Sequence, residues 1–398
     1  MTVSTITLGC RLNFAESEAM RSLADDGSII VNSCAVTGEA VRQTRQAIRR
    51  ARREHPARQI IVTGCAAQLD PEGFAAMPEV DRVIGNADKY RASAFNGDRR
   101  LVVSDVMTAA APPVAAGFLA RVRSFVAVQT GCDHRCTFCS IWQARGPSRS
   151  LPYEAVRDAV ARELDAGARE IVLTGVDITD YEGGLGPLCQ KLLADLPRLE
   201  RLRLSSLDSV EIDGALLELV AGEPRLLPHF HLSLQAGDDL VLKRMKRRHL
   251  RADAVRTVEQ LKAARSDVTI GADLIAGFPT ESEEAARNSL RLLDDCDIVA
   301  AHVFPFSARP GTAAARMPQL ERETVKARAA RLRDAAGERR MRWLDSLVGS
   351  TQTVLVENRE KGHCDVFAPV RIAGSERGEI GTARITGRDQ DMLIGTFE

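Results

Sequence analysis

The chain lacks the features of a membrane or exported protein. No apolar run in its 398 residues approaches the roughly 20 residues that a membrane-spanning helix needs. Its first residues, MTVSTITLGCRLN, have neither the basic region nor the long apolar core of a signal peptide. We therefore expect a cytoplasmic protein with no membrane partner, in which the nine cysteines stay reduced and form no disulfides.

The chain also lacks net charge, because its 54 basic residues are balanced by 54 acidic ones. No field over the whole molecule therefore directs it to nucleic acid. Basic residues gather locally in three segments, 40–58, 243–249 and 321–342. Any one of them is explained by a solvated helix face, but three in a neutral chain make a phosphate-binding face a reasonable hypothesis.

The first part of the chain, residues 1–108, alternates short apolar runs with helix-like segments. Strands are expected near 4–8, 28–32, 59–63 and 81–84, and helices near 14–25, 38–54 and 88–95. This alternation predicts a parallel α/β domain. The proline-containing stretch AAAPPVAAG then begins a linker that we place at 109–120.

The middle of the chain, residues 121–347, repeats the strand and helix pattern six times and ends in a long helix near 321–347. The six expected strands are SFVAVQ, EIVLTG, RLRLSS, HFHLSL, DVTIGADLI and DIVAAHVF. Six units are too few for a closed eight-stranded barrel, so we predict a partial (β/α)6 barrel with its site at the carboxyl ends of the strands. Residues 348–398 change to short β runs with glycine turns, which predict a small five-stranded barrel or sandwich.

Three cysteines stand close together in TGCDHRCTFCSIWQARG: Cys132, Cys136 and Cys139. Structural zinc normally takes four protein ligands, so a set of three fits zinc poorly. A 4Fe–4S cluster is held by thiolates, and three cysteines would leave one iron open to bind another molecule. Cys132 directly follows the first expected strand of the partial barrel, where a site of that fold belongs.

Three further cysteines occupy equivalent places in the first domain. Cys10, Cys34 and Cys65 end the runs TITLGC, SIIVNSC and QIIVTGC, each just past an expected parallel strand. The carboxyl ends of neighbouring parallel strands meet at one sheet edge, so the three thiols are expected to converge. We predict a second three-cysteine cluster there. Cys189, Cys296 and Cys364 are scattered singly and are interpreted as small buried hydrophobic residues.

These features resemble the methylthiotransferase branch of the radical S-adenosylmethionine (SAM) superfamily over nearly the whole chain. The matching segments include TLGCRLNFAESE, VNSCAVT, QTGCDHRCTFC, EIVLTGVDITDY, GADLIAGFPTE and HVFPFSARPGT, and the tail resembles the TRAM module, an RNA-binding β domain. TLGC with Glu16, LTGVD and HVFPFS favour the subgroup that acts on threonylcarbamoyladenosine in tRNA. The loop SIWQARG departs from the proline-containing loop that this family leads us to expect.

The resemblance implies two 4Fe–4S clusters. Cys132, Cys136 and Cys139 would be the catalytic triplet that holds the SAM-binding cluster, and Cys10, Cys34 and Cys65 would hold an auxiliary cluster that carries the sulfur. One-electron reduction by a partner protein would cleave SAM, and sulfur and a methyl group would then be added at C2 of the modified adenine in a tRNA anticodon stem-loop. A sulfur donor is implied as a further partner.

Polar and glycine residues near the ends of the expected barrel strands are predicted to bind SAM. The set is Gly175, Asp177, Ser205, Ser206, Gln235, Asp273, Gly277, Phe278, Pro279 and Arg309. Glycine lets backbone approach a ligand closely, and arginine suits a carboxylate or phosphate. Each of them is also explained as an ordinary strand-end or turn residue.

Three alternatives remain open at this point. Two keep the radical chemistry but act on isopentenyladenosine in tRNA or on a ribosomal-protein aspartate. The third is a two-cluster electron carrier without a substrate. For the tRNA-directed reading, we hypothesise that Arg45, Arg49 and Arg52 hold phosphates, and that Arg359, Lys361, His363, Phe367 and Arg371 form an RNA-binding patch in the tail.

Overall fold

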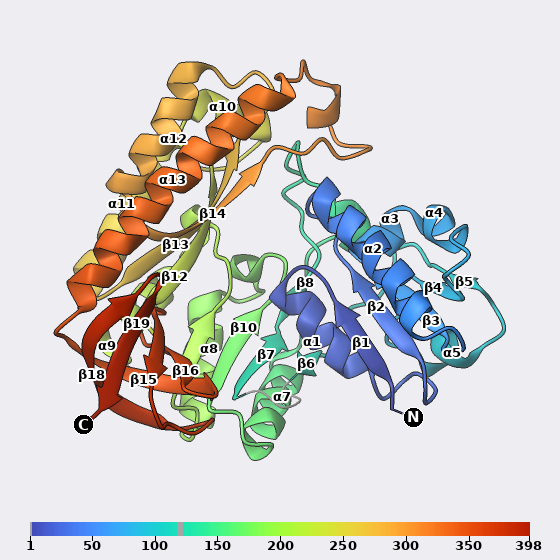
Figure 1. Cartoon of the computed structure of the whole chain (residues 1–398), viewed down its shortest axis with the longest axis horizontal. Coiled ribbons are helices and arrows are strands. Elements are labelled where there is room, and N and C mark those ends of the chain that lie inside the picture. The colour runs from blue at the N-terminus through green and yellow to red at the C-terminus, as the bar shows by residue number, and fades with distance from the viewer. Residues whose placement is uncertain (1, 118–121) are drawn as a thin grey trace.

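The computed structural model describes residues 2–117 and 122–398 (Figure 1). The first part of the chain forms a five-stranded sheet in the order β1-β2-β3-β4-β5. All neighbouring strands in it pair in parallel. The strands are β1 Ser4–Thr7, β2 Ile29–Ser33, β3 Ile60–Gly64, β4 Arg82–Ile84 and β5 Leu101–Val102. This confirms the predicted parallel α/β architecture, to which the structure adds the short edge strand β5.

Five helices accompany this sheet: α1 Arg11–Met20, α2 Gly38–Glu54, α3 Cys65–Leu69, α4 Pro71–Ala75 and α5 Ala92–Asn96. Helix α2 has the predicted bounds, and Thr37 accepts a hydrogen bond from the Ala40 amide at its start. Helix α1 starts earlier than predicted, directly after Cys10. The Asn13 side chain fixes that first turn, because it donates to the carbonyls of Leu8 and Ser33.

The central part is a partial barrel of six parallel strands. They are β7 Arg123–Ala127, β10 Glu170–Thr174, β11 Leu202–Leu204, β12 His229–Gln235, β13 Thr269–Ala276 and β14 Ile298–Pro305. β7, β10 and β11 form one sheet and β12, β13 and β14 another, and single parallel bridges at Leu202–Leu226 and Leu207–Leu232 join the two sheets. The predicted open barrel is therefore confirmed. The short strand β6 Ala116–Gly117, within the expected linker, pairs antiparallel with β7.

Helices cover the outside of this barrel (Figure 1). They are α7 Tyr153–Asp165, α8 Leu185–Asp195, α9 Gly214–Gly222, α10 Asp239–Met245, α11 Arg251–Ala264, α12 Glu283–Asp295 and the long α13 Arg322–Leu347. α6 Ile141–Arg145 and the hairpin of β8 Gln129–Thr130 with β9 Arg149–Ser150 flank the loop that carries Cys132. Residues 118–121, the end of the predicted linker and the first residue of the predicted core, lie outside the described residues.

The tail forms a closed five-stranded barrel, as predicted. Its order is β15-β16-β17-β19-β18. The strands are β15 Thr351–Asn358, β16 Lys361–Cys364, β17 Pro369–Ile372, β18 Ile380–Asp389 and β19 Met392–Phe397. Cys364 lies in its core, and Cys189 and Cys296 lie in the core of the central barrel, so the three single cysteines are buried hydrophobic residues. In the part of the chain that is described, no helix has the length and apolar composition to cross a membrane.

The tail barrel docks against the amino-terminal ends of the central strands (Figure 1). Phe367, between β16 and β17, stacks on His229 of β12 at 5.0 Å between ring centroids and on His363 at 4.6 Å. Beside it, three arginines bond a fully buried carboxylate, that of Glu170. Burial raises the pKa of Glu170, but the arginines outweigh it and hold that pKa well below its usual value.

This docking corrects the hypothesis of an RNA-binding patch in the tail. His363 and Phe367 face the central barrel, and His363 also bonds the Glu357 carboxylate at 2.6 Å. An aromatic ring packed between two domains cannot stack on a base. The remaining candidates are Arg359, Lys361 and Arg371, which do not take part in this stack.

Replacing Phe367 by alanine is expected to loosen the docking of the tail. Losing most of a partly buried phenylalanine costs about 2 kcal/mol. We expect limited proteolysis to release residues 348–398 faster, and the thermal midpoint to fall. Ile394→Ala is the matched control, because Ile394 is an exposed residue of the same small barrel. Equal protease resistance of Phe367→Ala and the wild type would contradict this role.

Candidate active site

The first cysteine triplet lines a cavity at the carboxyl ends of the central strands. Cys132, Cys136 and Cys139 all border this cavity of about 180 Å³, together with Asp177 and Gln235. The loop is tied back by bonds from the Cys132 amide to the Gly146 carbonyl and from the Thr137 amide to the Met245 carbonyl. The barrel therefore fixes the loop at both ends, in the place predicted for the site.

The three sulfurs are not gathered as ligands to one ion. Among the described residues, the groups with three ligand atoms within 4.8 Å of one another include Cys132–His134–Asp177 but no set of three cysteines. Ligands to different irons of a cluster lie farther apart than ligands to one ion. Burial raises the pKa of the Cys139 thiol to about 11 and that of Cys132 further, so these thiols need a nearby cation to become ligands.

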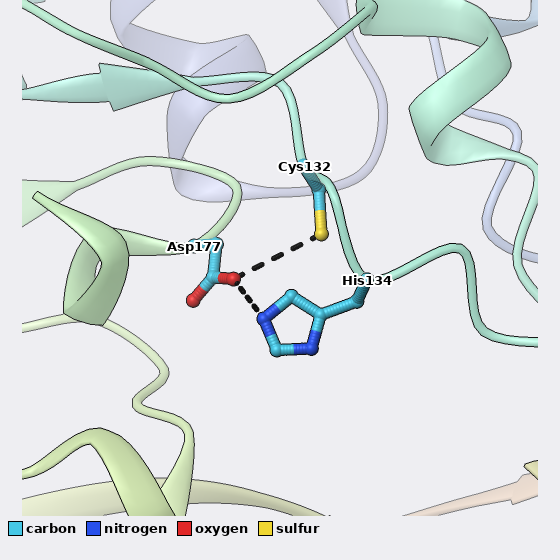
Figure 2. A group of neighbouring side chains, drawn as sticks. All are labelled: Cys132, His134 and Asp177. Carbon is cyan, nitrogen blue, oxygen red and sulfur yellow. Dashed lines mark hydrogen bonds and ion pairs between the residues drawn. The ribbon is translucent and has the colours of Figure 1, made fainter. Parts of the chain in front are cut away.

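A polar network beside Cys132 was not found by the sequence analysis (Figure 2). The His134 ring lies 2.6 Å from the Asp177 carboxylate, whose other oxygen accepts a hydrogen bond from Thr179. Burial raises the pKa of Asp177, but the hydrogen bonds from His134 and Thr179 and the nearby positive charges together outweigh it, so the pKa is lowered. Asp177 is therefore a buried anion at the cavity wall. In the sequence, the position of His134 between Cys132 and Cys136 indicates that its side chain lies near the first triplet.

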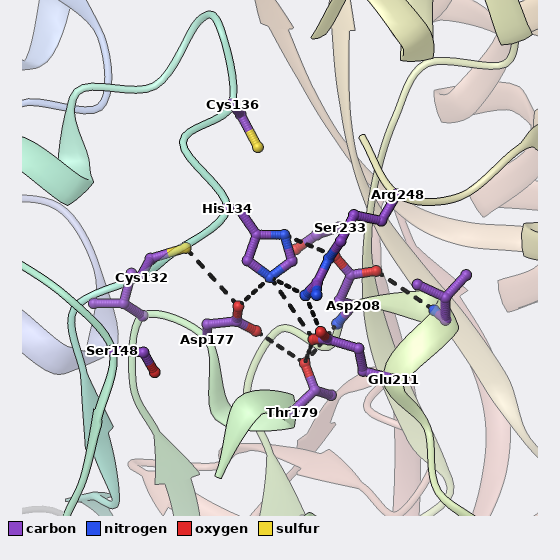
Figure 3. Close-up of polar contacts among 12 residues, drawn as sticks. Cys132, His134, Cys136, Ser148, Asp177, Thr179, Asp208, Glu211, Ser233 and Arg248 are labelled. Carbon is purple, nitrogen blue, oxygen red and sulfur yellow. Dashed lines mark hydrogen bonds and ion pairs between the residues drawn. The ribbon is translucent and has the colours of Figure 1, made fainter. Parts of the chain in front are cut away.

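The basic segment 243–249 contributes to the same network (Figure 3). Arg247 bonds Asp208 at 2.7 Å and approaches the Cys136 sulfur at 3.7 Å. Arg248 bonds Glu211 and the His134 ring. Arg247 and Arg248 therefore turn toward the first cysteine triplet, whereas Lys243 and Lys246 of the same segment are exposed.

The second triplet lies where the strands of the first domain end. Cys10 and Cys34 follow β1 and β2, and Cys65 begins α3 directly after β3. Glycines permit the close approach of these loops. A Cβ on Gly9 would lie 2.7 Å from the Cys34 sulfur, and Gly64 has a φ of +93°, which favours glycine.

The donor set of the second triplet also fits a cluster with one open iron. Cys34 and Cys65 are buried, while Cys10 is exposed. Burial raises the pKa of the Cys34 thiol to about 12. The charges of Cys10, Cys34 and Cys65 act on one another, as expected for three thiols gathered at one place.

Arg145, from the loop that follows the first triplet, joins the two sites. Its Nε donates to the Cys65 sulfur at 3.2 Å, and its terminal nitrogens donate to Glu16 at 2.7 Å and to Asn13 at 2.7 Å. Lys89 lies 2.6 Å from the other Glu16 oxygen. All three charged side chains are at most 3% exposed. The unusual SIWQARG loop thus carries a cation that contacts a ligand of the other domain.

A second cavity, of about 170 Å³, lies between the two triplets. Val36 and Thr37, just after Cys34, form one wall, and Cys139, Gln235 and Asp273 form the opposite one. The Gly38 amide donates to Ser307, another lining residue, at 3.1 Å and closes the domain boundary there. Of the six cysteines in the two triplets, Cys139 alone borders this cavity, and the lining residue Val36 comes two positions after Cys34.

The residues predicted to bind SAM fall into two groups. Asp177, Ser206 and Gln235 line the first cavity, and Gln235 and Asp273 line the second. The others are outside both linings: Gly175, Ser205, Gly277, Phe278, Pro279 and Arg309. Phe278 is fully buried and packs edge-to-face on Phe306. Arg309 lies close to Gly38, on the side of the second triplet.

The arginines predicted to hold phosphates on α2 are mostly engaged within the protein. Arg45 bonds Asp70 at 2.8 Å and lies over the Phe74 ring, and Arg52 bonds Asp81 and the Glu79 carbonyl. Pairing with acids removes much of their capacity to attract phosphate. Arg50 and Arg53, on the same helix, are exposed.

Models of two protein families match the chain. The radical SAM superfamily matches residues 126–293, which hold the catalytic triplet. The uncharacterized protein family UPF0004 matches residues 2–85, which hold the second triplet. Each match covers one of the two cysteine sites described above.

Relatives extend over almost the full length. The chain is 42% identical to the threonylcarbamoyladenosine tRNA methylthiotransferase MtaB of Rickettsia prowazekii, over 98% of this chain and 96% of the relative. The chain belongs to the tRNA methylthiotransferase family. It is 32% identical to MtaB of Thermotoga maritima, over 99% of this chain and 96% of the relative. It is 31% identical to the tRNA-2-methylthio-N(6)-dimethylallyladenosine synthase of Sorangium cellulosum, over 98% of this chain and 89% of the relative. The predicted family is thus confirmed.

A solved structure has the same fold. The radical S-adenosylmethionine methyltransferase TsrM from Kitasatospora setae matches 74% of this chain and 67% of its own chain, with a TM-score of 0.53 and 16% identity. At that identity the match supports the architecture and carries no information on substrate.

Removing either cysteine triplet is expected to halve the bound iron. Two 4Fe–4S clusters hold roughly eight irons per chain. Replacing Cys132, Cys136 and Cys139 by alanine should leave about half and abolish SAM cleavage, whereas replacing Cys10, Cys34 and Cys65 should leave about half with cleavage intact. Iron analysis and deoxyadenosine release measure these outcomes after anaerobic reconstitution. Cys189→Ala is the control, since that thiol is buried elsewhere, and full iron in either triple variant would refute the assignment.

Replacing Glu16 by glutamine is expected to weaken the junction between the domains. The change leaves Arg145 and Lys89 buried without their anion, which costs about 3–5 kcal/mol. Urea unfolding measures the loss, and Glu39→Gln, an exposed site on α2, should leave the midpoint unchanged.

The same junction predicts a pH dependence. Burial raises the pKa of Glu16, but Arg145 and Lys89 outweigh it and hold the pKa at about 2, below its ordinary value of 4.5. The stabilisation is therefore present above pH 4.5 and is lost as the pH falls toward 2. The Glu16→Gln variant should lack this component of acid destabilisation.

Proposed function

We propose that the protein inserts sulfur and a methyl group at C2 of N6-threonylcarbamoyladenosine next to the anticodon of tRNA. The observation that carries this proposal is the cavity between the two cysteine triplets. It offers one place where a base can meet a radical source on one side and a sulfur source on the other. The full-length similarity to MtaB proteins supports the same substrate.

The bound groups supply the difficult chemistry: the clusters and SAM provide the radical, the sulfur and the methyl group. The protein binds and orients them. We assign Cys132, Cys136 and Cys139 to the SAM-binding cluster and Cys10, Cys34 and Cys65 to the auxiliary cluster. Asp177 is an anion at the wall of the first cavity, suited to accept hydrogen bonds from SAM hydroxyl or amino groups.

Gln235 lines both cavities and is therefore placed to contact SAM and the substrate base together. Its backbone φ is +68°, which is uncommon for a residue with a side chain and points that side chain away from regular strand geometry. Ser206 and Asp273 complete the polar wall as proposed contacts. The remaining predicted SAM contacts lie outside both cavity linings and stay predictions: Gly175, Ser205, Gly277, Phe278, Pro279 and Arg309.

Three partners are part of the proposal. The tRNA anticodon stem-loop brings the base, and since it is unstacked in the loop, its insertion costs little. A one-electron reductant protein and a sulfur donor are required by the reaction. Arg50 and Arg53, which are exposed, replace Arg45 and Arg52 as the proposed phosphate contacts on α2. A tRNA substrate is consistent with action in the cytoplasm.

The alternatives are separated by what gains sulfur. An electron carrier would release no deoxyadenosine from SAM, and the cavity between the triplets is unexplained by electron transfer. A ribosomal-protein target is disfavoured by relatives named as tRNA enzymes. Isopentenyladenosine remains the second candidate, because the chain is also 31% identical to an enzyme of that type.

The deciding experiment is nucleoside mass spectrometry of total tRNA. The gene is expressed in a bacterial host that lacks its own methylthiotransferases for both modified adenosines. We expect the methylthio form of threonylcarbamoyladenosine to appear, and the variant lacking Cys132, Cys136 and Cys139 to yield none. Methylthio isopentenyladenosine alone would favour the second candidate, and neither product would contradict the proposal.

A further inference from the structure

Arg11 places a positive charge without an acidic partner inside the partial barrel. It is the first residue of α1, directly after the cluster ligand Cys10. Its guanidinium carbon lies 5.9 Å from the centroid of the Phe367 ring. Among the described residues, its side chain forms no hydrogen bond and no ion pair. A partly buried arginine normally finds an anion, so this one is free to bind an anion from outside the chain.

The neighbouring arginines do not share this property. Around Phe367 and Glu170, three arginines meet three carboxylates: Arg123, Arg201 and Arg203 against Glu170, Glu357 and Asp365. These six charges balance among themselves. Arg11 is a fourth cation beside them, and none of these three carboxylates forms an ion pair with it.

Asp273 is the other carboxylate near Arg11, and it is already engaged. It accepts hydrogen bonds from His231 at 2.9 Å and from His302 at 3.1 Å, both through the same oxygen. It acts on Arg11 through space without forming an ion pair with it. The His302 side chain, on the edge strand β14, is 64% exposed, and that of Asp273 is 24% exposed.

Asp273 connects Arg11 to the cavity between the two cysteine triplets, because it also lines that cavity. For a base held there for reaction at C2, the inference requires that its N6 substituent extend past Asp273 toward Arg11. In threonylcarbamoyladenosine this substituent ends in a carboxylate. A carboxylate is the kind of group that the unpaired guanidinium of Arg11 binds.

We propose that Arg11 binds the carboxylate of the threonylcarbamoyl group and so selects this substrate over adenosines with a neutral substituent. The inference rests on the proposed function and names the residue that recognises the N6 substituent of the substrate. The planar guanidinium can donate two parallel hydrogen bonds to a carboxylate. An isopentenyl group offers no acceptor, and it would leave the desolvated Arg11 unpaired.

The test uses two anticodon stem-loop RNAs that differ only at the carboxylate. One carries threonylcarbamoyladenosine and the other carries its methyl ester, which has no charge. Binding to the full reconstituted chain is measured by fluorescence anisotropy at one salt concentration, and kcat/KM for methylthiolation is measured in parallel. For the wild type we expect the ester to bind about 10- to 100-fold more weakly, the range of a lost charged hydrogen bond.

The variants decide the role of Arg11. Arg11→Gln should bind the acid about 10- to 100-fold more weakly than the wild type and bind acid and ester almost equally, whereas Arg11→Lys should keep part of the preference. Arg287→Gln, an exposed arginine on α12 on the outside of the barrel, should keep the wild-type ratio. Iron content and SAM cleavage without RNA confirm that the neighbouring cluster site is intact, and the binding ratio holds even where iron is lost.

A wild-type acid-to-ester ratio in Arg11→Gln would overturn the inference, and so would a wild type that does not distinguish the two RNAs. Either result leaves the proposed function standing if threonylcarbamoyladenosine is still methylthiolated. Failure of the wild type to methylthiolate either RNA would instead count against the proposed function. The acid-to-ester binding ratio therefore tests the role of Arg11, and methylthiolation by the wild type tests the proposed function.

Discussion

The buried contact among Arg145, Glu16 and Cys65 is the interaction on which the arrangement of the two sites depends. Arg145 belongs to the loop of the first triplet, and its partners belong to the other domain. Hydrogen bonds between charges excluded from water are directional and costly to break, so the domains cannot slide along each other without losing them. The distance between the triplets, and with it the cavity that lies between them, is set by this junction.

Local patterns made most of the fold and the positions of the six cysteines at the strand ends predictable. Each cysteine of the first domain follows a strand and a tight turn, so residues such as Gly64 and Cys65 reveal their position without knowledge of the tertiary structure. Ion pairs between charged residues far apart in sequence were harder to predict. Arg45 and Arg52 read as an RNA-facing stripe, because nothing near them indicates that Asp70 and Asp81 lie opposite.

Long-range packing explains the other differences between the sequence-based predictions and the structure. Phe367 looked like part of an RNA-binding surface, because a single aromatic residue beside basic ones has the same pattern whether it faces a base or another domain. Its stacking on His229 is a contact between residues 138 positions apart. His134 and Asp208 were missed for a related reason: each is an ordinary polar residue until the barrel brings them together. By closing the amino-terminal mouth of the barrel, the tail leaves the carboxyl ends as the side from which ligands enter.

The glycines before Cys10 and Cys65 have a consequence for the lifetime of the enzyme. Gly9 and Gly64 have positive φ values that a larger residue resists, and the strands behind them, β1 and β3, pair in register with β2. The protein backbone thus constrains the shape of these cysteine loops. If oxygen destroyed a cluster, its binding loops would keep their shape. The cell could then rebuild the cluster in the folded protein without making a new chain.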